Sequence, residues 1–223
     1  YDRAHSAFAN VALDDFDWPN IVAKTRVFVA SGINPALSSS AHQVTLAAVK
    51  AARAAGKVVA FDLNYRSKLW DIRTARKVLS EYLPYVDILF TSGGDAADVL
   101  GFTGPLGEDL VLRISEQLDI PTVCLVYGPG AGCDALWRAI CASEGKTYIA
   151  EQQGALDTVD RVGAGDAFAG GFLTGFLEEG PALGVKLGNA VMTLKNTYKG
   201  DISWVTREAV DAYLAGEGGM LRR

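Results

Sequence analysis

The sequence predicts an α/β fold, in which a doubly wound, mostly parallel sheet is flanked by helices. Three observations support this prediction. Short runs of β-branched and aliphatic residues recur up to residue 126, and glycine, proline or polar residues bound each run. The runs are almost continuously apolar, which is typical of strands buried on both faces of a parallel sheet. Between them lie segments whose apolar residues repeat with helical spacing.

Four runs are the expected parallel strands: R-V-F-V-A (26–30), K-V-V-A-F-D (57–62), V-D-I-L-F (86–90) and T-V-C-L-V (122–126). The helix expected after the first strand, at 38–55, opens with three serines that can cap it and stops at Gly56. Further helices are expected at 71–83 and 108–118, each with an acidic residue at its start. This alternation of strand and helix is the pattern of a doubly wound sheet.

After residue 126 the pattern changes. A glycine-rich turn, G-P-G-A-G, separates T-V-C-L-V from D-A-L-W-R-A-I, and T-Y-I-A-E-Q follows, which predicts antiparallel strands or a hairpin. Three helices are expected to close the chain, at 164–178, 182–199 and 206–215. No internal repeat or linker-like stretch interrupts the sequence, so residues 1–223 are predicted to form a single domain.

Composition excludes several classes of function. With 223 residues, 49% hydrophobic and 21% charged, the chain is typical of a globular protein. Its net charge of -5 gives no basic surface for nucleic acid, and no apolar stretch or leader predicts a membrane partner. The cysteines form no C-x-x-C pair and are odd in number, which predicts neither zinc nor disulfides and favours a reducing, cytoplasmic compartment; they are Cys124, Cys133 and Cys141.

The first candidate site follows the second expected strand. In an open α/β sheet, ligands bind beyond the carboxyl ends of the strands. The segment D-L-N-Y-R places Asp62, Asn64 and Arg66 at such an end. The planar guanidinium of Arg66 could bind a carboxylate through two hydrogen bonds. A solvated surface loop is the alternative interpretation of these polar residues.

The second candidate site is the segment D-R-V-G-A-G-D (160–166), which precedes a predicted helix. Gly163, Ala164 and Gly165 have small side chains that leave the first amides of the helix open to an oxyanion or phosphate. Asp166 lies in that first turn, where a carboxylate could accept a proton from a substrate hydroxyl. Alternatively, Asp166 only complements the positive end of the helix.

Four stretches of the chain resemble a known family when they are taken together. They are Y-D-R-A-H-S-A (1–7), F-D-L-N-Y-R-S-K-L-W (61–70), V-D-R-V-G-A-G-D-A-F-A-G-G-F (159–172), and L-K-N-T-Y-K-G-D with V-T-R-E-A-V (194–201 and 205–210). In this order they resemble the PfkB, or ribokinase, family of carbohydrate kinases, and within it the 2-keto-3-deoxygluconate kinases. The resemblance implies the C-terminal portion of a ribokinase-like fold, and the family's N-terminal strands and β lid are expected to be absent from this chain.

The resemblance implies ATP-dependent phosphorylation of a sugar hydroxyl. Asp166 would be the catalytic base, and the amides of Gly163, Ala164 and Gly165 would stabilise the transferring phosphoryl group, which suits a reaction that needs positioning and charge stabilisation.

The resemblance also implies the residues that bind the sugar, which would be Tyr1, Arg3, Asn64 and Arg66. Two arginines suit an anionic substrate, which favours a sugar acid such as 2-keto-3-deoxygluconate over neutral fructose or ribose.

On the nucleotide side, the resemblance implies ATP and magnesium as cofactors. ATP would contact the turn at Gly128 and Gly130 and the helix near Asn189. The family's Asn-x-x-Glu element corresponds to residues 92–95 here, which makes Ser92 a nucleotide-side candidate and Asp95 the metal-ligand candidate. A monovalent-cation site near Asp160 stays open.

Three functions remain open at this stage: a sugar-acid kinase, a kinase of a neutral sugar, and a non-catalytic nucleotide- or sugar-binding module of kinase ancestry. The altered element at Ser92 and Asp95, and Val126 where many members have lysine, are consistent with the third. Asp166 beside an intact Gly-Ala-Gly favours a kinase. In relatives the lid often forms the dimer contact, so a homodimer is expected only where the lid is present.

Overall fold

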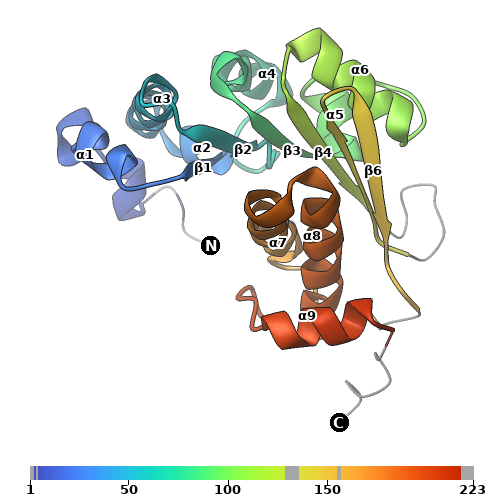
Figure 1. Cartoon of the computed structure of the whole chain (residues 1–223). Coiled ribbons are helices and arrows are strands. Elements are labelled where there is room, and N and C mark those ends of the chain that lie inside the picture. Colours follow the sequence, from blue (N-terminus) through green and yellow to red (C-terminus); the bar gives the residue numbers. More distant parts are fainter. Residues whose placement is uncertain (1–2, 4, 129–135, 155–156, 217–223) are drawn as a thin grey trace. The chain divides into compact units, whose positions relative to one another are not determined.

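The computed structural model describes residues 3, 5–128, 136–154 and 157–216 (Figure 1). Its strands follow one another in the order β1-β2-β3-β4-β5-β6 in a six-stranded sheet. The chain divides into two compact units, Tyr1–Val123 and Cys124–Arg223. The predicted α/β class with a mostly parallel sheet and flanking helices is confirmed, whereas the single domain stays a prediction.

The first unit is built on parallel strands. β1 (Val27–Ser31), β2 (Val58–Asp62) and β3 (Ile88–Ser92) pair in parallel, and Ser31, Asp62 and Phe90 stand level at their carboxyl ends. The three central residues of β2 are fully buried, as expected of a strand covered on both faces. The sheet therefore brings the segments that follow β1, β2 and β3 to one edge.

The helices of this unit begin where the sequence offers caps. α3 (Ser39–Ala54) begins after Ser38, whose hydroxyl accepts a hydrogen bond from the Ala41 amide at 3.0 Å. α4 (Ile72–Ser80) is capped by Asp71, and α6 (Glu108–Leu118) matches its predicted bounds. The helix expected at 71–83 ends three residues early, because the Pro84 ring cannot continue it and Leu83–Tyr85 forms a 3-10 turn.

The sequence did not anticipate the shorter elements of the first unit. These are α1 (Trp18–Ala23), α2 (Ile33–Leu37), α5 (Gly93–Asp98) and the 3-10 turns Ala7–Asn10 and Leu13–Asp15. Each is six residues or fewer, so the sequence offers too few turns for a helical repeat to be recognised. α5 is the one that bears on the site, because it begins directly after β3.

The second unit contains the predicted antiparallel pair. β4 (Thr122–Tyr127) continues into this unit, and β5 (Arg138–Ser143) pairs with β6 (Lys146–Glu151) in an antiparallel hairpin. The two linking residues, Glu144 and Gly145, both have positive φ angles, of 51° and 71°. Such angles are characteristic of the tight turn that matches the twist of two antiparallel strands.

Three helices complete the second unit: α7 (Ala164–Glu179), α8 (Pro181–Lys195) and α9 (Arg207–Leu214). The prediction placed the end of α8 at residue 199, but the helix ends at Lys195. Beyond it, the Asn196 carbonyl accepts hydrogen bonds from the Val159 amide at 2.7 Å and the Asp160 amide at 3.2 Å. The chain therefore leaves the helix to hold the segment that precedes α7.

α7 and α8 lie side by side, and glycines form their contact (Figure 1). A Cβ atom at Gly175 would lie 2.7 Å from the backbone of Leu183, and one at Gly171 would lie 2.9 Å from the Leu187 carbonyl oxygen. On α8, Gly184 and Gly188 likewise lie against residues of α7, which are Phe172 and Phe168. The glycine-rich composition of both helices thus allows direct contact of their backbones.

Gly175→Ala is expected to lower the free energy of unfolding by about 1–3 kcal/mol, because the added methyl would overlap the backbone of α8. Gly170→Ala is the matched control, because a Cβ there would meet nothing within 4 Å. The control is expected to be neutral or to raise stability by about 0.5–1 kcal/mol through helix propensity. Urea unfolding of both variants measures the difference, and equal effects would contradict the packing interpretation.

Candidate active site

The turn before α7 has the backbone that an anion site requires. Gly163 is in the left-handed region, with a φ angle of 80°, and its carbonyl accepts a hydrogen bond from the Ala167 amide at 2.9 Å. A Cβ at Gly165 would meet nothing within 4 Å, so a ligand can approach its backbone. The Ala164 amide donates to the Arg161 carbonyl at 3.1 Å, and Ala164 is buried. Gly165 and Asp166 are therefore the exposed residues at the start of the helix.

The same turn is held against the segment that follows α8. The Asp160 carboxylate accepts hydrogen bonds from the Val162 amide at 3.0 Å and from the Gly200 amide at 2.9 Å. A Cβ at Gly163 would lie 2.3 Å from the Asp201 carbonyl oxygen. Both the positive φ angle and this close approach require glycine at 163.

The electrostatics of this contact favour the charged form of Asp160. Its pKa is lowered from 3.8 by the Val162 and Gly200 amides and by the nearby Lys195 and Lys199 charges. Lys195 is fully buried and donates to the Asp160 carbonyl at 3.0 Å. Asp160 is thus a structural carboxylate, because each of its two oxygens accepts a hydrogen bond from a backbone amide.

Asp166 lines a cavity of about 380 Å³ that lies within the second unit. Gly163 and Gly170 line it on the α7 side, and Leu187 and Val191 line it on the α8 side. The segment from residue 201 to the start of α9 supplies polar groups, which are those of Asp201, Ser203, Thr206 and Arg207. The carboxylate of Asp166 is exposed there, so a hydroxyl group could reach it.

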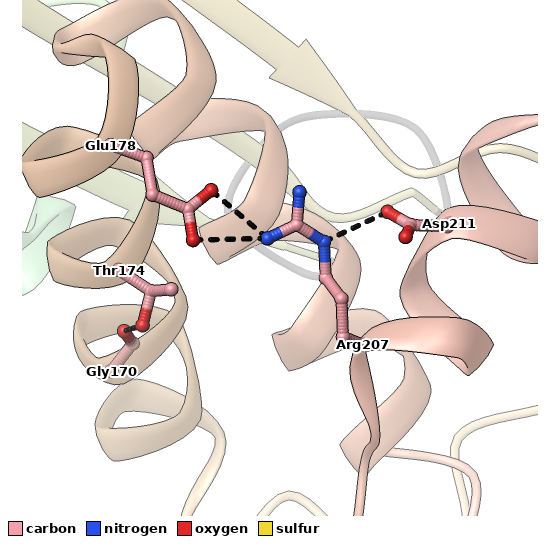
Figure 2. A network of polar contacts seen from close by, with 5 residues as sticks. All are labelled: Gly170, Thr174, Glu178, Arg207 and Asp211. Atoms are coloured by element: carbon pink, nitrogen blue, oxygen red, sulfur yellow. Dashed lines mark hydrogen bonds and ion pairs between the residues drawn. The ribbon is translucent and has the colours of Figure 1, made fainter.

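Arg207 fixes one wall of this cavity. Figure 2 shows its guanidinium between Glu178 of α7 and Asp211 of α9, at 2.9 Å and 3.1 Å from the two Glu178 oxygens and 3.0 Å from Asp211. Thr174 turns its hydroxyl back to the Gly170 carbonyl, at 2.9 Å. Arg207 therefore joins two helices and is already paired with two carboxylates.

On the predicted nucleotide side, Trp137 joins two of the candidate residues. A Cβ at Gly128 would lie 2.5 Å from the indole, and the Asn189 side-chain amide donates to the Trp137 carbonyl at 3.3 Å. Asn189 is almost fully buried, with 2% of its surface exposed. The third candidate, Gly130, lies outside the described residues. The sequence offered no signal for Trp137 beyond its place shortly after the glycine-rich turn.

The other candidate residues that the structure describes lie in the first unit. Asn64 follows β2 at the carboxyl edge of the sheet, whereas Arg3 precedes β1. Asn64 has a φ angle of 41°, and its side-chain amide donates to the Ser31 hydroxyl at 3.1 Å. Arg3 is half-buried and its carbonyl accepts a hydrogen bond from Ser6 at 2.8 Å, whereas Tyr1 lies outside the described residues. The contact between Asn64 and Ser31 joins the ends of β2 and β1.

Arg66, Ser92 and Asp95 come together in this unit. The Ser92 hydroxyl caps α5 by accepting a hydrogen bond from the Asp95 amide at 3.1 Å. Burial raises the pKa of the Asp95 carboxyl, while the Tyr65 amide, the Arg66 charge and Ser92 act in the opposite direction. The charge of the candidate acid-binding arginine thus acts on the candidate metal ligand, while the Arg66 guanidinium itself donates to the Tyr65 carbonyl at 3.1 Å.

The side chains of the described residues offer few ligands for a metal ion. Within the described ranges, no three His, Cys, Asp or Glu side chains are grouped so that they could hold one. A single carboxylate, such as that of Asp95, still fits magnesium, which is commonly held by one or two carboxylates together with substrate phosphates.

Across the part of the chain that is described, no helix is both long and apolar enough to cross a membrane.

The chain belongs to the pfkB family of carbohydrate kinases, which it matches over residues 1–207. A 2-dehydro-3-deoxygalactonokinase of Haloferax volcanii is 34% identical over 97% of this chain and 65% of its own length. A fructokinase of Klebsiella pneumoniae is 32% identical over 77% of this chain and 52% of its own length.

Among solved structures, that of a 2-dehydro-3-deoxygluconokinase from Thermotoga maritima matches with a TM-score of 0.86 and 30% identity. The match covers 97% of this chain and 68% of that one. The predicted family and the ribokinase-like fold are confirmed. The chain spans about two thirds of the lengths of the Haloferax and Thermotoga proteins.

Asp160→Asn is expected to lower the temperature of unfolding at neutral pH, because the amide nitrogen of asparagine cannot accept a hydrogen bond from a backbone amide. The folded pKa of Asp160 is lowered, so its contribution is complete above the unfolded value near 3.8 and is lost as the pH falls through the lower folded value. The difference between variant and unchanged protein, followed by circular dichroism, should shrink below pH 3.8. Asp157→Asn, in the same exposed segment, is the control, and a pH-independent difference for Asp160→Asn would contradict the expectation.

Proposed function

We propose that the protein containing this chain is an ATP-dependent kinase that transfers the γ-phosphoryl group to a hydroxyl of a 2-keto-3-deoxy sugar acid. One observation carries this proposal: an exposed aspartate, Asp166, stands in the first turn of α7, beside the open backbone of Gly165 and at the wall of a cavity. Family membership supports phosphoryl transfer to a carbohydrate.

The proposed base and the proposed anion site lie on the same turn. Asp166 accepts the proton of the attacking hydroxyl, which makes the oxygen a better nucleophile as the bond to phosphorus forms. The backbone of Gly163 and Gly165, at the positive end of α7, stabilises the negative charge on the oxygens of the transferring group. The Ala164 amide, which the sequence assigned to the same role, instead donates to the Arg161 carbonyl at 3.1 Å. The hydrogen bonds of Asp160 keep this turn in place, so little rearrangement is needed during transfer.

Asp95 with Ser92 would hold a magnesium ion, which would supply the charge neutralisation that phosphoryl transfer needs. Gly128 and Asn189 would flank the nucleotide, and Gly130 is assigned there with them. A monovalent cation near Asp160 is part of the same proposal, with its carboxylate already fixed by two amides. The reaction is proposed to take place in the cytoplasm.

Arg66 supports an acidic sugar as the acceptor. It follows β2, at the edge where the strand ends meet, and its guanidinium is exposed. Asn64, two residues earlier, would bind a sugar hydroxyl, and Tyr1 and Arg3 are assigned to the same substrate. The names of the Haloferax and Thermotoga relatives agree with a keto-deoxy sugar acid. The planar guanidinium of Arg66 is suited to bind the carboxylate of such an acid through two parallel hydrogen bonds.

A neutral sugar is the second candidate, and one observation favours it. The guanidinium of Arg66 already lies near the Asp95 carboxylate, which offsets part of its positive charge. The Klebsiella relative, a fructokinase at 32% identity, is consistent with this alternative. A non-catalytic module remains the third candidate, and loss of activity on Asp166 substitution would exclude it.

Asp166→Asn is expected to reduce kcat by about 10²–10⁴-fold, because asparagine cannot take the hydroxyl proton. The assay couples ADP formation to a panel of sugar acids and neutral sugars. Glu179→Gln, an exposed carboxylate at the far end of the same helix, is the control and should keep full activity. Turnover that is unchanged in Asp166→Asn would rule out its role as the base.

Arg66→Met is expected to raise KM for a sugar acid by about 10- to 100-fold, the range of a lost charge-assisted hydrogen bond. KM for a neutral sugar should change little, because no carboxylate is bound there. Lys68→Met removes an exposed positive charge two residues along and is the matched control. An equal rise in KM for sugar acids and for neutral sugars would favour the neutral-sugar kinase.

A further inference from the structure

Arg161 stands between Asp160 and the turn that precedes α7. Its carbonyl accepts the Ala164 amide at 3.1 Å, so its backbone is part of the start of the helix. Its side chain is exposed, yet it has a defined position, because the guanidinium carbon lies 5.2 Å from the centre of the Trp137 ring. A guanidinium at this distance over an indole face makes a favourable cation–π contact.

Trp137 is held firmly enough to position a second side chain. Its carbonyl accepts the Gln152 amide at 2.8 Å and the Asn189 side-chain amide at 3.3 Å, and its own amide donates to the Gln152 side chain at 3.3 Å. Its indole nitrogen lies 3.3 Å from the side-chain amide of Asn196. The indole also packs on the backbone at Gly128. Trp137 therefore links the predicted nucleotide turn to Arg161.

Negative charge at the turn makes a nearby cation favourable for the binding of a polyphosphate. Asp160 and Asp166 both place negative charge close to the first amides of α7. Lys195 is fully buried and donates to the Asp160 carbonyl, so a ligand cannot reach it. Arg207 is paired with two carboxylates, as described above. Lys199 is a second exposed cation near Asp160, in the segment that follows α8. Arg161 differs from it because its own backbone belongs to the turn.

We propose that Arg161 binds the phosphate oxygens of the nucleotide and that Trp137 positions it for this contact. The inference rests on the proposed kinase function and deepens it. The indole covers one face of the guanidinium and leaves the N–H groups at its edge free to donate to phosphate oxygens. Arg161 is the residue that touches the nucleotide, and Trp137 acts through it.

The test is direct binding of ATP, ADP and AMP, measured by calorimetry on the purified protein. Arg161→Gln is expected to weaken ATP and ADP binding by about tenfold or more, the effect of a lost charge-assisted hydrogen bond, and to weaken AMP binding less. Arg161→Lys should recover part of the loss. Lys186→Gln, which removes an exposed charge from α8, is the control and should change binding less than about threefold.

The role of Trp137 is tested by one substitution that keeps an aromatic ring and by one that removes it. Trp137→Phe keeps an aromatic face and should retain ATP affinity within about threefold, whereas Trp137→Leu should weaken the binding of ATP and ADP more than that of AMP.

The affinity of Arg161→Gln for ATP should also depend less on salt than that of the unchanged protein, because one ion pair is missing.

The possible results separate this inference from the proposed function. If the unchanged protein binds ATP and Arg161→Gln binds it equally well, the role of Arg161 is wrong and the kinase proposal stands. An equal loss for ATP, ADP and AMP, with a lowered unfolding temperature, would assign Arg161 a structural role and overturn the inference. If the unchanged protein binds none of the three nucleotides, the kinase proposal fails and this inference fails with it.

Discussion

The candidate site of the second unit depends on one contact, the pair of hydrogen bonds from the Val162 and Gly200 amides to the Asp160 carboxylate. This contact joins the segment before α7 to the segment after α8. It brings the backbone of residue 201 so close to residue 163 that only glycine fits there. The position of Asp166 follows from it, because the helix begins at the next residue.

The contact is reinforced by two buried residues at the end of α8. Lys195 reaches the Asp160 carbonyl from inside the protein, and the Asn196 carbonyl holds two amides of the same segment. Hydrogen bonds of this kind are most valuable where the groups are shielded from water, and Lys195 and Asn196 are both buried. The early end of α8 is thus a requirement of the site, since in a longer helix the Gly200 amide would donate to the Asn196 carbonyl, whereas here it donates to the Asp160 carboxylate.

Much of the fold could be predicted from the sequence, because strands buried on both faces and helices with caps leave local patterns. β2 and α6 are the clearest cases: one is a continuous apolar run and the other starts with two acidic residues. The contacts that organise the site could not be predicted. Trp137 meets Asn189 across 52 residues and Asp160 meets Gly200 across 40, and local periodicity carries no information at that separation. The motif identified Asp166 and its glycines. The cavity beside them is also lined by residues of α8 and of the chain that follows α8, which the motif does not contain.

The glycine contact between α7 and α8 has a consequence for movement. Where two backbones touch, no flexible side chain lies between them that could change rotamer and let one helix slide along the other. The rings of Phe168 and Phe172, both fully buried, pack on Gly188 and Gly184 of α8, so sliding α7 along its axis would press them against the larger neighbours of these glycines. The start of α7, which carries Asp166, is therefore fixed within the second unit, so the proposed reaction requires the sugar to be brought to Asp166 and not the reverse.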